Sequence, residues 1–124
     1  MQNCSSKFKI YDIKHRAYYF SIKTIKLLEN LPEKYIYRTI GNQLLRSATS
    51  IGANIIEAQA ASSKKDFQNF INHALKSDNE TKYWFCLLRD GVKVKIKDVS
   101  ELLQEVDELS KILDASMLRL KGRR

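Results

Sequence analysis

Four stripes of apolar residues at helical spacing run through almost the whole sequence and leave little choice of fold class. Each stripe advances by steps of three or four residues, which places its side chains on one face of an α-helix. Each stripe also needs a partner, and short connections favour antiparallel neighbours. We therefore expect an all-α fold, an antiparallel up-down-up-down four-helix bundle, formed by a single domain at residues 1–124. The predicted helices are residues 11–31, 35–61, 64–90 and 99–121.

Local signals mark the connections between these helices. Pro32 disfavours helical geometry at Leu31 and ends the first helix there. Ser63, followed three residues later by Asp66, has the spacing of a capping box that begins the third helix. The segment GVKVKIKD at residues 91–98 alternates Val or Ile with Lys, as a strand does. A lone strand has no sheet to pair with, so we expect an extended loop, with a short ribbon between two subunits as the alternative.

The second helix carries an unusual second face in the run from Gln43 to Lys65. One stripe of this helix is apolar and is typical of a core. A different face carries polar residues, and small residues beside it remove bulk, so that neighbouring backbones can approach closely. We expect a polar network or a subunit interface here, and a solvated face is the alternative. The residues of this candidate are Arg46, Ser50, Gly52, Asn54, Glu57 and Glu80.

The charge of the chain favours a polyanionic partner. Lys and Arg number 22 against 14 Asp and Glu, which gives a net charge of +8. Basic side chains that neutralise phosphates release condensed counterions, so nucleic acid is the expected partner, and a merely solvated basic surface is the alternative. Lys93, Lys95 and Lys97 would lie on one side of an extended stretch. The other candidate phosphate contacts are Arg119, Lys121, Arg123 and Arg124 near the C-terminus, and then Lys64 and Lys65.

Nothing in the sequence supports an enzyme, a metal site or a membrane protein. No apolar run approaches the ~20 residues that span a bilayer, and the first residues lack the apolar core of a signal peptide, so we expect a cytoplasmic protein. Dimetal bundles use paired Glu-x-x-His motifs. Asp12 and His15 have that spacing only once and with a shorter acid. Nucleotide-binding loops, hydrolase motifs and paired-cysteine motifs are missing, so we expect no catalysis and no cofactor.

Three motifs resemble one known family. RSATSIGANIIEA at residues 46–58, SKKDF at 63–67 and ETKYWF at 80–85 are similar to bacterial four-helix-bundle proteins encoded within intervening sequences of 23S rRNA genes, also called S23 ribosomal proteins. The resemblance spans roughly residues 8–120, and GVKVKIK is its least family-like part. The family in turn resembles the accessory protein of diversity-generating retroelements, a basic pentameric barrel that binds nucleic acid and a reverse transcriptase.

This resemblance implies a homopentamer of bundles with a role on RNA or DNA. The alternative is a protein–protein assembly or adaptor module, with an unidentified protein partner and incidental positive charge.

Overall fold

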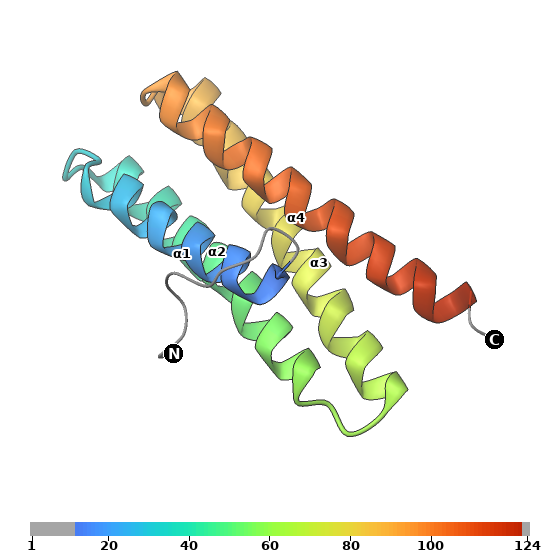
Figure 1. Ribbon diagram of the computed structural model, residues 1–124. Helices are drawn as coiled ribbons and strands as arrows, with labels where there is room; N and C mark the ends of the chain where they lie inside the picture. Colours follow the sequence, from blue (N-terminus) through green and yellow to red (C-terminus); the bar gives the residue numbers. More distant parts are fainter. Residues whose placement is uncertain (1–11, 123–124) are drawn as a thin grey trace.

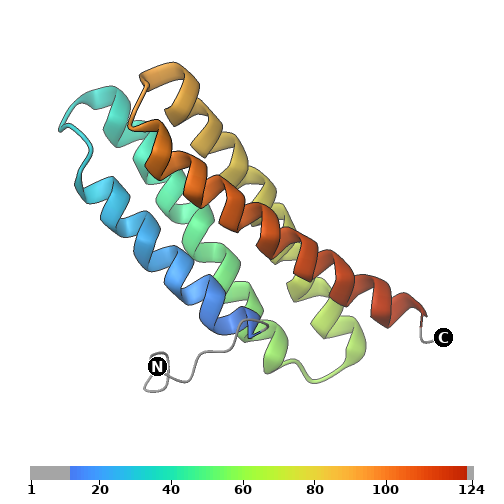
Figure 2. The same ribbon diagram turned by 45° about the horizontal axis from the view of Figure 1, so that its top comes forward.

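The fold is an antiparallel bundle of four helices, seen in a computed structural model that describes the backbone of residues 12–122 and the side chains of residues 12–95 and 97–119. Each helix packs against its neighbours in sequence, and α1 also packs against α4, which closes the bundle (Figures 1 and 2). No strand occurs within residues 12–122, as the sequence predicted. The helices are α1 (Ile13–Glu29), α2 (Tyr35–Gln59), α3 (Lys64–Leu87) and α4 (Ile96–Gly122), with a π-helical turn, η1 (Leu88–Val92), after α3.

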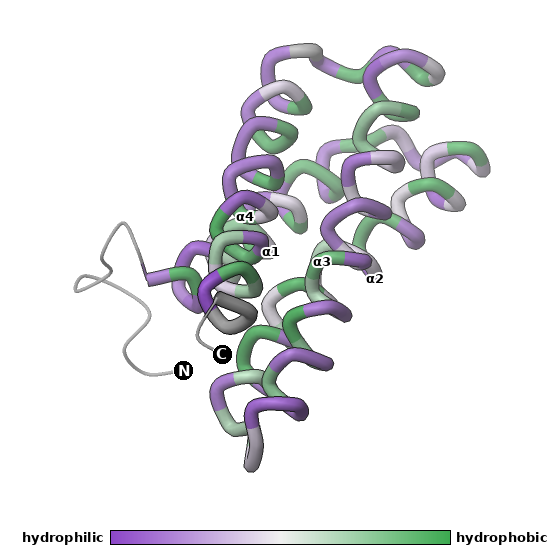
Figure 3. Tube along the Cα trace, turned by 90° about the vertical axis from the view of Figure 1, so that its right-hand side faces the viewer, coloured by the Kyte–Doolittle hydropathy of each residue, from purple (hydrophilic) through white to green (hydrophobic). Residues whose placement is uncertain are grey.

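The core is built from the apolar stripes that the sequence shows. Hydrophobic and hydrophilic residues alternate along every helix, as Figure 3 shows. Phe20 of α1 and Phe85 of α3 meet edge to face in the middle, with ring centroids 6.1 Å apart. Removing such large side chains from water is the main stabilising contribution of a bundle this size. The largest fully buried apolar residues are Phe20, Phe85, Leu44, Ile51, Ile55, Leu88, Leu109, Leu113, Val99 and Val106.

Ser63 begins α3 in the way the sequence predicted. Its Oγ accepts a hydrogen bond from the backbone N–H of Asp66 at 3.0 Å. This contact pairs one of the N–H groups that the first turn of a helix leaves without a partner. The acidic side chain of Asp66 in the same turn also suits the positive end of the helix dipole.

Gly52 allows α1 and α2 to approach closely. A Cβ placed on this glycine would lie 3.5 Å from the Cβ of Ala17 and 3.8 Å from the Ala17 backbone. The first of these is an ordinary van der Waals contact, so a methyl group fits, whereas a larger side chain does not. Gly52 therefore serves a contact between α2 and α1 within one chain.

The prediction of an extended loop at residues 91–98 is largely wrong. Helical structure continues from α3 through η1 to Val92, and α4 already begins at Ile96, three residues before the predicted start. Only residues 93–95 lie outside a helix. Lys93 has φ 58° and ψ 46°, the left-handed conformation that commonly ends a helix.

Tertiary contacts explain why the alternation did not produce an extended segment. Val92 and Val94 are both partly buried and pack against the core. The N–H of Val94 donates to the carbonyl oxygen of Leu88 at 3.3 Å, and the Tyr37 hydroxyl donates to that of Val92 at 3.3 Å. The apolar residues are therefore held by the bundle. Because Lys97 belongs to a helix, the three lysines do not share one side of an extended stretch.

Candidate nucleic-acid interface

The predicted phosphate contacts fall at opposite ends of the bundle. One end, here called end A, carries the α1–α2 connection (residues 30–34) and the α3–α4 connection (residues 93–95), as Figures 1 and 2 show. The opposite end, end B, carries the α2–α3 connection (residues 60–63) and the last turns of α4. Lys97 and Arg119 are separated by roughly 33 Å along α4 at a rise of 1.5 Å per residue. The two predicted basic clusters therefore cannot form one compact site within a subunit.

End A holds Lys93, Lys95 and Lys97. All three side chains are exposed, and none of them makes an ion pair with the residues that the structure describes. Lys93 occupies the left-handed position described above, where glycine is the usual residue. The three lysines remain close in sequence and at the same end, although they project from a turn and from the first turn of α4. Their charges are available to a partner because no carboxylate within the bundle neutralises them.

Sequence reasoning missed two further cations at end A, Lys34 and Arg38. Lys34 is the N-cap of α2, Arg38 lies in its first turn, and both are exposed without an ion pair among the described residues. The hydrogen bond between Tyr37 and η1 ties this turn of α2 to the α3–α4 connection. A signal existed in the sequence, because α2 has no acidic residue in its first turn and basic residues there oppose the helix dipole.

The helix ends at end A also favour an anion. Both α2 and α4 begin there, so the positive ends of two helix dipoles lie at this end (Figure 2). Lys34 gives no side-chain cap to α2, and backbone N–H groups of a first turn are good donors to phosphate.

Arg89 of η1 differs from the unpaired cations of end A. It donates hydrogen bonds of 2.8 and 3.0 Å to its neighbour Asp90 and lowers the pKa of that carboxyl. Arg89 is therefore already neutralised.

End B is described less completely. Lys64 and Lys65 are exposed in the first turn of α3, and Arg119 is exposed on α4; none of the three has an ion-pair partner within the described structure. The side chain of Lys121 lies outside the described residues, as do Arg123 and Arg124 altogether. Only one member of the predicted C-terminal cluster can therefore be placed, and it lies at the end of the molecule that also carries Lys64 and Lys65.

The predicted polar network divides into two separate groups along the α2–α3 seam. Arg46 of α2 pairs with Glu80 of α3, and the indole N–H of Trp84 also donates to Glu80 at 3.1 Å. This first group is surface-exposed, so its ion pair contributes little to stability.

The second group is more buried and joins hydroxyl groups across the seam. Ser77 donates to Ser50 at 2.9 Å, the amide of Asn54 donates to Ser50 at 3.0 Å, and the Thr81 and Ser47 hydroxyls are 2.9 Å apart. Glu57 belongs to neither group. Its side chain is exposed and makes no hydrogen bond or ion pair within the described residues, while Gly52 faces α1. The six predicted residues therefore do not form one network.

Asp78 is an unusual residue that sequence reasoning overlooked. It is fully buried on α3, and neither carboxylate oxygen has a hydrogen-bond partner in the described structure. Lys82 lies 3.5 Å from it, 3.4 Å from Asp107, and donates to Ser110 at 3.0 Å. The signal was its position, because Asp78 falls in the stripe that includes Ala74, Thr81 and Phe85 on the core side of α3. A carboxylate at such a position must lose water.

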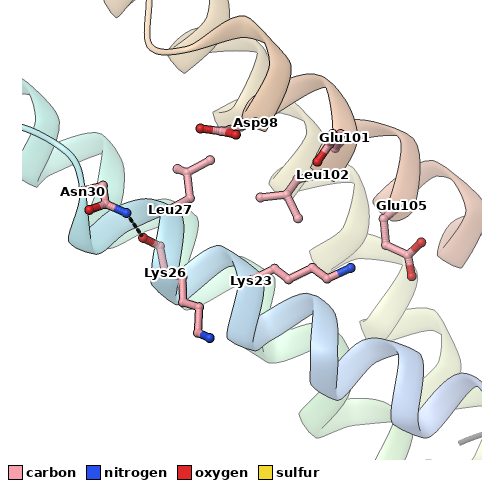
Figure 4. Close-up of a pocket in the computed structure, with 8 residues that line it drawn as sticks. All are labelled: Lys23, Lys26, Leu27, Asn30, Asp98, Glu101, Leu102 and Glu105. Atoms are coloured by element: carbon pink, nitrogen blue, oxygen red, sulfur yellow. Dashed lines mark hydrogen bonds between the residues drawn. The ribbon is translucent and has the colours of Figure 1, made fainter.

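A cleft between α1 and α4 is lined by opposite charges (Figure 4). Its volume is about 340 Å³, with Leu27 and Leu102 among its lining residues. At one edge Arg16 bridges the two helices, at 2.8 Å from Glu105 and 2.7 Å from Glu108, and this contact lowers the pKa of Glu108. The mixture of signs makes the cleft a poor anion site. Its charged residues are Lys23 and Lys26 on α1 and Asp98, Glu101 and Glu105 on α4.

The remaining chemistry of the described residues is limited. No group of three or more His, Cys, Asp or Glu in this part of the chain could hold a metal ion. Asp12 and His15 instead contact each other, with 2.7 Å between Asp12 Oδ2 and His15 Nδ1. Across residues 12–122, no helix combines the length and the apolar character that a membrane crossing requires.

Comparisons with known proteins identify the family. Residues 9–115 match the family of 23S rRNA-intervening sequence proteins. A similar solved structure is a protein of unknown function from the S23 ribosomal protein family of Bacteroides thetaiotaomicron. It is 34% identical, the match covers 83% of this chain and 95% of that one, and the TM-score is 0.76. A comparison with curated proteins finds no match. The family match covers most of the chain and agrees with the motifs and with the bundle, and the chain therefore belongs to the 23S rRNA-intervening sequence protein family.

Proposed function

We propose that this chain is a non-enzymatic nucleic-acid-binding protein that assembles as a homopentameric ring and contacts phosphates through end A. The observation that carries the proposal is the group of exposed cations without internal ion pairs at this end, Lys34, Arg38, Lys93, Lys95 and Lys97. Two helices also begin at end A, so the fixed dipoles and the side-chain charges favour the same kind of ligand.

The absence of ion pairs between the five cations of end A and the other described residues matters for the free energy of binding. A lysine that already pairs with a carboxylate must break that pair before it neutralises a phosphate. The five cations of end A have no such pair to break, so each can release a counterion when a phosphate approaches. Such contacts position a nucleic acid without reading its bases, so the proposal is of binding without strong sequence preference.

The pentamer is supported by the resemblance of the family to the pentameric accessory protein of diversity-generating retroelements. The family description refers to 23S rRNA, so RNA is the first ligand to test. Repetition of end A around a ring would bring several copies of the same cations to one long ligand. That arrangement would strengthen binding without any further contact in each subunit.

Filter binding with a fluorescent single-stranded RNA, at several salt concentrations, tests the proposal. Replacement of Lys93, Lys95 and Lys97 by Gln should weaken binding and reduce the logarithmic salt slope by about 0.7 for each lysine that neutralises a phosphate. The matched control replaces Lys64, Lys65 and Arg119 at end B by Gln, which removes the same charge from the other end of the bundle. This control should bind with nearly the wild-type slope.

Two outcomes would contradict the proposal. A loss of affinity confined to the control would place the binding site at end B. Binding that is weak in the wild-type protein and insensitive to salt would instead favour the protein–protein assembly or adaptor module, since contacts with a protein partner need not release counterions.

A further inference from the structure

A strip of uncharged side chains covers the outer side of the α1–α2 pair. Eight large hydrophobic residues of the described structure are exposed, and four of them belong to this strip: Tyr18 (36% exposed), Ile25 (40%), Leu45 (38%) and Ile56 (42%). The positions that complete the strip are small or hydroxyl-bearing. The strip consists of Tyr18, Ser21 and Ile25 on α1 and Leu45, Thr49, Ala53 and Ile56 on α2.

Helical spacing places these residues together. On α2 they recur at steps of four, four and three, and on α1 at steps of three and four, so each set lies on one face. The two faces adjoin because α1 and α2 pack against each other, with Gly52 opposite Ala17 and Gly41 opposite Leu28. Figures 1 and 2 show the two helices side by side along their whole common length.

We infer that this uncharged strip is where another copy of the chain docks, and that it forms one side of the subunit contact. The inference rests on the assembly part of the proposed function and names the surface that it uses. A contiguous exposed apolar surface of this kind commonly marks an interaction site.

Charge favours a second copy as the occupant. The chain carries a net charge of +8, so copies of it repel each other where their basic surfaces meet. Between Lys14 and Glu29 on α1, the strip contains no charged residue, and on α2 the charged residues next to it are Arg46, which is paired with Glu80, and Glu57, which is acidic. This surface can therefore approach another basic copy without adding an unpaired cation to the contact. The small residues Ser21, Thr49 and Ala53 let a neighbouring surface come close between the larger side chains.

Light scattering on purified full-length protein tests the inference. Leu45→Lys, Ile56→Lys and Ala53→Lys each introduce a charge into the strip, and Ala53→Lys removes only an exposed methyl group, so folding should survive. Each variant should fall from the assembled mass, five times the 14.4 kDa subunit for a pentamer, toward a single subunit at micromolar concentration. Tyr35→Lys and Leu118→Lys are matched controls, because these residues are 70% and 68% exposed and lie outside the strip. The controls should keep the wild-type mass.

Circular dichroism of every variant shows whether the helices persist. Folded strip variants that keep the assembled mass would overturn the inference while leaving a ring possible through another surface. Controls that dissociate as readily as the strip variants would overturn it as well. A wild-type mass of one subunit would defeat both the inference and the assembly part of the proposed function, whereas the salt dependence of RNA binding would still test the rest.

Discussion

Replacement of Asp78 by Asn tests the packing of the bundle through a pH dependence. Burial raises the pKa of Asp78 from 3.8 to about 7 against the opposing charge of Lys82, and the carboxylates of Asp107 and Asp114 add to the rise. At neutral pH the protein must therefore either hold a proton on a buried carboxyl or bury an ion whose oxygens have no hydrogen bond within the described residues. Asn has nearly the same shape and cannot ionise.

The sign of the effect follows from proton linkage. A folded pKa above the unfolded value means that the folded chain binds the proton more tightly. The stability from this group is complete below about pH 4 and is lost as the pH rises to about 7. A shift of about three pKa units corresponds to about 4 kcal/mol in the free energy of unfolding. The Asp78→Asn variant has no such loss of stability as the pH rises. Its free energy of unfolding relative to that of the wild type should therefore rise by about 3 kcal/mol between pH 5 and pH 8.

Urea denaturation followed by circular dichroism, at pH 5, 6, 7 and 8 and one protein concentration, measures this difference. Asp107→Asn is the matched control, because Lys111 and Lys82 hold the pKa of Asp107 below its ordinary value. Its difference from wild type should therefore be a loss of stability that stays nearly constant from pH 5 to pH 8, because this carboxyl is ionised in both the folded and the unfolded chain over that range. A constant difference between Asp78→Asn and wild type from pH 5 to pH 8 would show that water or Lys82 reaches the carboxylate, and the argument from burial would fail.

Two further predictions concern backbone positions. Gly52→Ala should be tolerated or stabilise by up to about 1 kcal/mol, because its methyl group fits against Ala17 and alanine favours helix; Gly52→Leu should cost about 1 to 3 kcal/mol. Equal urea midpoints for Gly52→Leu and wild type would show that α1 does not pack there. Lys93→Gly should stabilise by about 1 kcal/mol because glycine adopts the left-handed conformation freely, whereas Lys93→Val should destabilise. A thermal melt in which the Val variant is the more stable would contradict this backbone conformation.

The sequence predicted the four helices and the cap at Ser63 because these depend on local patterns. An apolar stripe at helical spacing predicts one buried face of the helix, whatever the helix packs against. A capping box pairs backbone N–H groups at the end of its own helix. The segment at residues 91–98 was predicted wrongly because its alternation is short. Val92 and Val94 are both held against the core, and contacts from distant residues such as Tyr37 decide the local backbone.

The candidate site was harder to predict because it depends on which segments meet. Lys34 and Arg38 join the lysines of residues 93–97 only after the bundle brings the α1–α2 and α3–α4 connections to one end. The same folding places Lys97 and Arg119 at opposite ends of the bundle, although the sequence alone is compatible with one binding site that contains both. Asp78 was missed because a carboxylate is rarely fully buried, so its charge argued against burial although its position in the stripe of α3 favoured it; the packing of α4 over α3 buries it.

The uncharged strip and end A together restrict how an assembly can bind nucleic acid. In a closed ring every subunit is related to the next by rotation about one axis, so all copies of end A lie at the same level along that axis. A dimer formed through the strip would instead relate the two bundles by a two-fold axis that exchanges the subunits. Its two copies of end A would then not have to contact the same ligand. The five cations of end A in one subunit account for a salt slope of at most about 3.5 for single-stranded RNA if each contributes about 0.7. A measured slope well above this value that still falls when the end A lysines are replaced would indicate that several copies of end A contact the same RNA, as a ring allows.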